Sequence, residues 1–218
     1  ITNGRMLVLN HRTAPHCPVV WATRMSMSIP LLWQEVVWQE EWGLYDGRDI
    51  TGSAIVDGGV LSNFPIALFI SQSPPVKAIM GQKKAGRILG MMIDEGTPLD
   101  NAVEGEEEKG NVLDAGRFGS LKTVQRIMQL VNTMMQASDM LYADHLERLI
   151  LRLPAKGYGT TEFDMTDERR TRLVDNGRNR AANYFQQNRS MVLSGSGDEL
   201  DDDQQAHVDD LAARMLGF

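Results

Sequence analysis

The sequence predicts an α/β protein, because short apolar strands alternate with segments of helical periodicity along the chain. Apolar runs of strand length end at turn residues, as at 54–56 before Asp57 and at 149–153 before Pro154. Between these runs, apolar residues recur at intervals of three and four over 121–142, which is the pattern of an amphipathic helix. These observations favour the α/β class over an all-α or an all-β fold.

Composition excludes several classes of protein. The 218 residues are 42% hydrophobic and 23% charged, which is ordinary for a globular protein with a packed core. The net charge of −7 argues against nucleic acid as a partner, because phosphate binding needs a basic surface. No apolar run approaches the ~20 residues of a transmembrane helix. Any contact with a membrane surface is therefore expected to be local and transient.

The location of the protein is predicted from its one cysteine. Cys17 has no second cysteine with which to form an internal disulfide, and this favours a reducing compartment, the cytoplasm. The chain begins with Ile1 and not with Met, so we expect that the true N-terminus is missing and that targeting cannot be judged from this end.

The first half of the chain is expected to contain mostly short elements. Short buried strands are predicted at 6–9 and 18–23, or else a strand that leads into a helix ended by Pro30. After the strand at 54–56, Pro65 fits the first turn of a helix. The elements expected there are a helix at 65–71, β-like segments at 76–79 and 86–93, and a long mobile loop at 94–119.

The second half is expected to be more regular. Ser120 begins the long amphipathic helix, and a strand follows at 149–153. Thr166 is a good N-cap for a helix that runs to about Gln187. We assign 1–187 to one domain and 188–218 to a flexible acidic tail with room for a short helix around 206–215.

Asp57-Gly58-Gly59 is the sharpest local motif. A carboxylate at the end of a strand lies at the edge of the sheet, where α/β proteins build their sites. Glycines permit positive φ and let another segment approach closely, which suits an aspartate that must reach a nucleophile across a gap. Taken alone, however, Asp-Gly is also one of the commonest turn dipeptides, and an ordinary turn would account for it.

The residues around the motif change that balance. The segment 21–30 ends in Ser28-Ile29-Pro30, and the segment 54–66 runs through Asp57-Gly58-Gly59 to Asn63-Phe64-Pro65. With the stretch 151–164, this order resembles the second half of a patatin-like phospholipase domain. The resemblance covers roughly 1–187 and is strongest over 18–70. Several ordered elements are far more specific than three residues.

The resemblance implies a three-layer sandwich, with a central sheet between flanking helices, of which this chain holds an incomplete part. It implies a lipid acyl hydrolase of the phospholipase A type, which uses a Ser-Asp dyad and needs neither a metal nor a cofactor. The substrate is a lipid or phospholipid ester, and Asp57 is the proton acceptor, within the motif residues Gly58 and Gly59. An aspartate base working near pH ~7 needs apolar walls, so we expect Asp57 at the bottom of an apolar cleft.

The chain departs from the family at the nucleophile. It contains no Gly-x-Ser-x-Gly sequence and no glycine-rich loop ahead of its first strand. Gly195-Ser196-Gly197 lacks the spacing, and Ser120 is better explained as a helix cap. We expect a partial sequence that is inactive as written. The alternative is a non-catalytic lipid-binding or scaffolding module with a patatin-like fold.

Other candidate residues have simpler explanations. Ser26 and Ser28 are interpreted as packing and local hydrogen bonding, and the acidic runs as solvated loops. His11, His16 and Cys17 match no zinc spacing and are assigned to a surface turn. Two further sets could contact acyl chains, but packing is the favoured interpretation for both. They are the tryptophans Trp33, Trp38 and Trp42, and the methionines Met128, Met134, Met135 and Met140.

Overall fold

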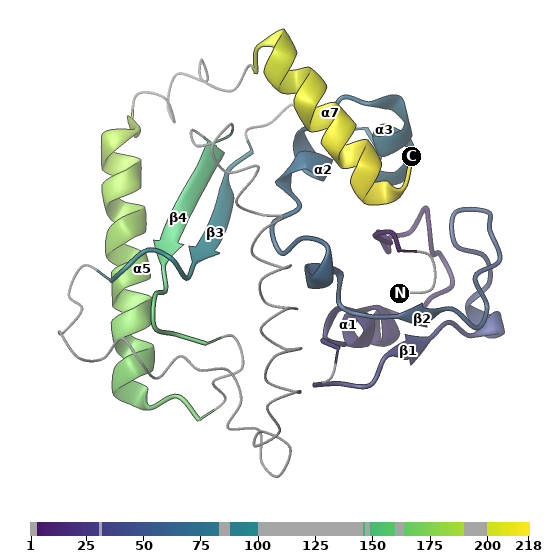
Figure 1. Ribbon diagram of the computed structural model, residues 1–218, viewed down its shortest axis with the longest axis horizontal. Coiled ribbons are helices and arrows are strands. Elements are labelled where there is room, and N and C mark those ends of the chain that lie inside the picture. Colours follow the sequence, from purple (N-terminus) through teal and green to yellow (C-terminus); the bar gives the residue numbers. More distant parts are fainter. Residues whose placement is uncertain are drawn as a thin grey trace. The chain divides into compact units, whose positions relative to one another are not determined.

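The computed structural model describes residues 4–30, 32–82, 88–99, 146, 149–159, 164–189 and 200–218 (Figure 1). These residues form a mixed α/β structure with five α-helices and two small two-stranded sheets. They divide into two compact units, each with one of the sheets. The first unit takes its described residues from 4–82 and 200–218, and the second takes them from 88–189.

The first unit begins with an irregular segment and a short helix. Residues 6–9 form no strand: the Val8 amide donates to the Tyr45 hydroxyl at 3.0 Å, so it has a side chain as its partner. Helix α1, Val19–Ser26, starts directly after Pro18. The strands predicted at 6–9 and 18–23 are therefore wrong. Of the alternative, a strand that leads into a helix ended by Pro30, only the helix is confirmed. A fixed proline φ is compatible with a helix start, which explains the outcome.

A small antiparallel ribbon follows. Strand β1, Val36–Val37, pairs with β2, Ala54–Ile55, so that Val36 lies opposite Ile55. The strand predicted at 54–56 is confirmed. Between the two strands, the chain forms a 3₁₀ turn at Glu40–Trp42.

Aromatic side chains from this connection form the core of the unit. Trp38 is 1% exposed, and its ring meets the ring of Trp42 edge-on at a centroid distance of 5.4 Å. The indole N–H of Trp38 donates to the Gly43 carbonyl at 2.9 Å, so this polar group is satisfied inside the core. The packing interpretation is thus confirmed for Trp38 and Trp42, whereas Trp33 is 45% exposed.

Two short helices continue the first unit. Helix α2, Ile66–Ile70, confirms the helix predicted after Pro65. Helix α3, Pro74–Met80, replaces the β-like segment predicted at 76–79, which is wrong. A short apolar run cannot by itself distinguish a strand from a buried helix, and here prolines at the first helical positions decide for the helix.

The C-terminal residues of the first unit correct another expectation. A flexible acidic tail was predicted over 188–218, yet Asp202–Leu216 form helix α7, which contains the short helix expected near 206–215. Its buried side chains, spaced by three and four residues, are Val208, Leu211, Ala212 and Leu216. Figure 1 shows α7 beside α2 and α3, against which it packs. The acidic run begins the helix, since Asp201 and Gln204 form a capping box.

The second unit is a parallel strand pair with one long helix. Strand β3, Gly90–Asp94, pairs with β4, Ile150–Pro154, with Gly90 opposite Ile150. Helix α5, Asp167–Gln187, packs against β4. These elements confirm the strands predicted at 86–93 and 149–153 and the helix that begins after Thr166.

Two predictions fall outside the described residues. The helix over 120–142 lies there entirely, as does nearly all of the loop predicted at 94–119. Within the described part of the chain, the strands form two separate pairs and no larger central sheet. The described residues therefore show the α/β class but not a three-layer sandwich.

Candidate functional site

Asp57 lies where β2 ends and a 3₁₀ turn, Gly58–Val60, begins. Its amide donates to the Ser28 carbonyl at 3.0 Å, which ties the end of the ribbon to the segment after α1. One carboxylate oxygen, Oδ1, accepts the amide of Gly59 at 2.8 Å and caps the turn. The described residues supply no hydrogen bond to the other oxygen, Oδ2.

The two glycines of the motif do not have the conformation expected of them. Neither Gly58 nor Gly59 has a positive φ, because a 3₁₀ turn uses right-handed angles open to any residue. A Cβ added to Gly58 would meet nothing within 4 Å. The prediction that these glycines serve a left-handed backbone is therefore wrong. Open space at Gly58 leaves room for an approaching ligand or segment.

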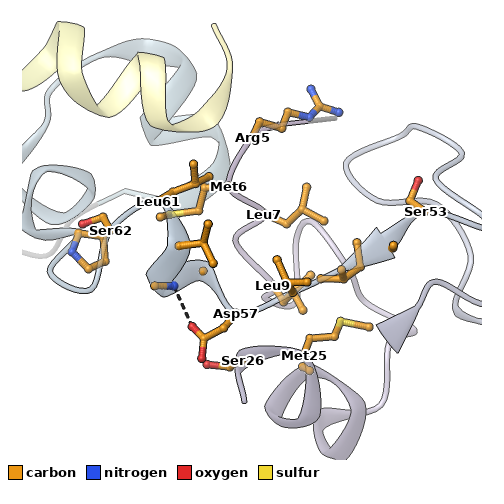
Figure 2. A pocket seen from close by; sticks show the side chains of 18 of the residues that line it. Arg5, Met6, Leu7, Leu9, Met25, Ser26, Ser53, Asp57, Leu61 and Ser62 are labelled. Carbon is orange, nitrogen blue, oxygen red and sulfur yellow. Dashed lines mark hydrogen bonds between the residues drawn. The ribbon is translucent and has the colours of Figure 1, made fainter. Parts of the chain in front are cut away.

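A cavity of about 850 Å³ opens beside Asp57, within the first unit. Its lining is largely apolar and includes Leu7, Leu9, Met25 and Val60 (Figure 2). A volume of this size is typical of small-molecule sites, which combine apolar walls with a few placed polar groups. Asp57 is half-buried in the wall of this cavity, whereas the sequence predicted it at the bottom of an apolar cleft.

Helix α1 presents one face to the cavity. Val19, Ala22, Thr23 and Ser26 line it, and their spacing by three and four residues places them on one side of the helix. The Ser26 hydroxyl makes no hydrogen bond with the described residues. The packing interpretation of Ser26 is thus not supported. Helical spacing from Val19 is the signal that would have placed it at the site.

Ser28, by contrast, has the structural role that the sequence suggested. It is fully buried, and its hydroxyl donates to the Arg24 carbonyl at 2.8 Å. The Ser28 hydroxyl oxygen also accepts a hydrogen bond from Arg24 Nη1 at 2.7 Å. Ser28 therefore fixes the segment whose carbonyl holds the Asp57 amide, and it acts on the site only through this support.

The metal-site candidates remain apart from the cavity lining. His11 and His16 are exposed in turns, as the sequence interpretation held, and neither lines the cavity. Burial raises the pKa of the Cys17 thiol, which makes it less reactive. Among the described residues, no three His, Cys, Asp or Glu side chains are grouped so that they could hold a metal ion.

The described helices include none that is long and apolar enough to cross a membrane.

Comparison with known proteins gives one distant relative. The chain is 29% identical over 195 residues to the uncharacterized protein YqhO of Bacillus subtilis strain 168. The match covers 86% of this chain and 55% of YqhO, so the chain spans about half the length of its relative. No family model matches the sequence, and no solved structure matches the chain.

Proposed function

We propose that this chain is part of a lipid acyl hydrolase with a patatin-like three-layer fold, in which Asp57 is the proton acceptor of a Ser-Asp dyad. The observation that carries the proposal is the position of Asp57. It ends a strand, one of its oxygens is held by a backbone amide, and it lies beside a largely apolar cavity of about 850 Å³.

The geometry of the carboxylate suits the task of a base. A general base must be held in one orientation and must keep a lone pair for the incoming proton. The bond from Gly59 to Oδ1 supplies the orientation, and Oδ2 has no hydrogen bond from the described residues. An ordinary turn aspartate would explain the first contact, but it would not require an apolar cavity beside it.

In the proposed reaction, a serine oxygen attacks the ester carbonyl of a lipid while Asp57 accepts the hydroxyl proton. The bond between the carbonyl carbon and the alkoxy oxygen then breaks, and the proton passes to the leaving alcohol. In a second cycle, water attacks the acyl carbon while Asp57 accepts a proton from it. The bond between the acyl carbon and the serine oxygen then breaks, the proton returns to serine, and the fatty acid leaves. Because the chain has no Gly-x-Ser-x-Gly motif, the proposal places the serine in polypeptide encoded ahead of residue 1.

A second candidate function is a non-catalytic lipid-binding module with the same fold. The missing motif favours it, since the cavity and Asp57 alone cannot carry out acyl transfer. The upstream coding sequence separates the two candidates. A Gly-x-Ser-x-Gly after an apolar strand supports the hydrolase, and its absence supports the binding module.

Activity of the complete protein gives the direct test. We expect Asp57→Asn to lower hydrolysis of a neutral short-chain ester, such as p-nitrophenyl butyrate, by at least ~100-fold, the usual contribution of a general base. Asp49→Asn is the matched control. Asp49 also accepts an amide two residues ahead, from Thr51 at 2.9 Å, but it is exposed and does not line the cavity. A folded Asp57→Asn protein that retains hydrolysis would refute the assignment.

The proposal extends to the cellular location of the protein and to its contact with membranes. We place it in the cytoplasm, because the one cysteine of the chain cannot form an internal disulfide. A transient contact with a membrane surface would deliver the lipid. Val19 and Val20 at the start of α1 are 80% and 71% exposed, and Val19 also lines the cavity.

A further inference from the structure

Arg5 is the one cationic side chain among the described residues that line the cavity. Asp57 is the one anionic side chain there, and the remaining lining is apolar or uncharged. In the view of Figure 2, the side chains of Leu7 and Leu9 lie between Arg5 and Asp57. The cavity therefore combines apolar walls with one group of each charge.

The guanidinium of Arg5 has no hydrogen-bond or ion-pair partner in the described part of the chain, although it lies close enough to Tyr45 to oppose the rise in pKa that burial gives that hydroxyl. The Nε of Arg5 is buried without a partner. Leaving a buried donor without an acceptor is unfavourable, so such groups normally have a partner. The described residues from 4 to 34 include no aspartate or glutamate that could neutralise it locally.

The stem of Arg5 is nevertheless held in place. The amide of the next residue, Met6, donates to the Met215 carbonyl at the end of α7 at 3.0 Å. Gly217 packs so closely on Arg5 that a Cβ there would come within 3.1 Å of Arg5 Cδ. An unpaired cation on a fixed stem is a preorganised site for an anion.

We propose that the cavity binds an amphipathic anion, whose phosphate or carboxylate pairs with Arg5 while its alkyl chain lies against Leu7, Leu9 and Met25. A guanidinium presents paired N–H donors that match either oxyanion. The inference rests on the proposed function in placing a lipid in this cavity. It adds that the preferred lipid carries a negative charge.

A purely structural role is the competing explanation for Arg5. Its position at the C-terminal end of α7 places a cation near the negative end of a helix dipole. In that case Arg5 would stabilise the docked helix, and it would have no influence on which ligand the cavity prefers. The two explanations therefore differ in ligand preference.

Isothermal titration calorimetry on the 218-residue chain tests the proposal with four probes: decyl phosphate, decanoate, decanol and inorganic phosphate. We expect both amphipathic anions to bind at least about tenfold more tightly than decanol and than inorganic phosphate. Arg5→Met, which keeps the apolar stem, should lower the affinity for the anions to that for decanol. Arg12→Met is the matched control, because Arg12 is exposed in the same unit and does not line the cavity.

Each outcome decides the proposal. Equal affinity for decanol and decyl phosphate, or anion binding that survives Arg5→Met, overturns the anion site but leaves a lipid cavity in place. Inorganic phosphate as tight as decyl phosphate overturns the amphipathic ligand. Absence of binding by all four probes overturns the site as a whole. Circular dichroism and tryptophan fluorescence check that the variant is folded, and Arg5→Lys should restore part of the preference. The assay of ester hydrolysis with Asp57→Asn tests the proposed function in a separate experiment, so that function can fail while the anion site stands.

Discussion

Helix α7 is held by its buried apolar face and also by one carboxylate, Asp209, whose removal gives a quantitative test of the structure. Its Oδ1 accepts from the Ser71 hydroxyl at 2.7 Å and from the Gln72 and Ser73 amides at 2.6 and 3.2 Å. Gln205 on the same helix donates at 3.0 Å. The contacts join residues 136–138 positions apart, so they link α7 to the connection between α2 and α3.

The contribution of Asp209 can be estimated from these contacts. Asp209→Ala leaves the fully buried Ser71 hydroxyl without this acceptor, at a cost of about 1–3 kcal/mol. It also removes an oxygen that accepts the Ser73 amide ahead of α3, and loss of a capping oxygen costs about 1 kcal/mol. The exposed Gln72 amide can turn to water and adds little. We therefore expect the free energy of unfolding of the first unit to fall by about 2–4 kcal/mol.

Urea unfolding followed by tryptophan fluorescence measures this loss. The four tryptophans of the chain all belong to the first unit, so their signal reports on the unit that contains α7. Asp210→Ala is the control, since Asp210 pairs with Arg214 at 2.9 Å on the solvated side of α7. An exposed pair of this kind contributes at most about 0.5 kcal/mol. Equal losses of stability in the two variants would show that Asp209 does not hold the helix.

Two further predictions concern the second unit and the dependence of stability on pH. Thr166→Ala should lower the stability of α5 by about 1 kcal/mol, because the Thr166 hydroxyl caps the helix by accepting the Arg169 amide. Amide hydrogen exchange in the first turn of α5 measures this loss. Unchanged exchange would contradict the prediction. Burial alone would raise the pKa of Asp94, but the Thr97 hydroxyl, nearby amides and Arg152 outweigh it and lower the pKa below its ordinary value. The stabilisation is therefore complete above the unfolded value of about 3.9 and is lost as the pH falls through the lower folded value. Asp94→Asn should flatten this acid dependence in far-UV circular dichroism, and an unchanged slope would count against it.

Much of the local structure could be predicted from neighbouring residues. Helix α5 begins after Thr166 and ends at Gln187, as its cap and composition predicted, because both signals lie within the helix itself. Strands β2, β3 and β4 were predicted from short apolar runs ended by turn residues. In each case the predictive signal lies in residues close in sequence, although the strand partners, such as Gly90 and Ile150, lie far apart along the chain.

The wrong predictions have different physical causes. The run at 76–79 is apolar enough for a strand or a helix, and its packing with α7 is a contact with residues far along the chain. The acidic run near 201–203 was interpreted as a solvated loop. Its side chains are exposed, but Asp202 and Asp203 form the first turn of α7, and the apolar stripe after them gives the helix a face to bury. A charge run at a helix start and a charge run in a tail have the same composition, and only the following periodicity separates them.

The candidate site was predicted in part. Asp57 was identified from its strand, its glycines and the Asn-x-Pro that follows, and the structure places it beside an apolar cavity. Ser26 and Arg5 were not identified as lining residues. Ser26 carried a helical spacing that could have been used, whereas nothing near Arg5 in the sequence indicates that α7 would pack on its stem.

By itself, the sequence determined the α/β class, the caps and ends of the longest described helix, and the aspartate at the end of β2, because each depends on interactions a few residues long. The tertiary structure decided that α7 packs against α2 and α3 and that Arg5 and Asp57 share one cavity. Those outcomes depend on contacts such as Met6 with Met215 and Ser71 with Asp209, which join distant parts of the chain. Local propensity and periodicity carry no information about such pairings, so they could be learned only from the folded chain.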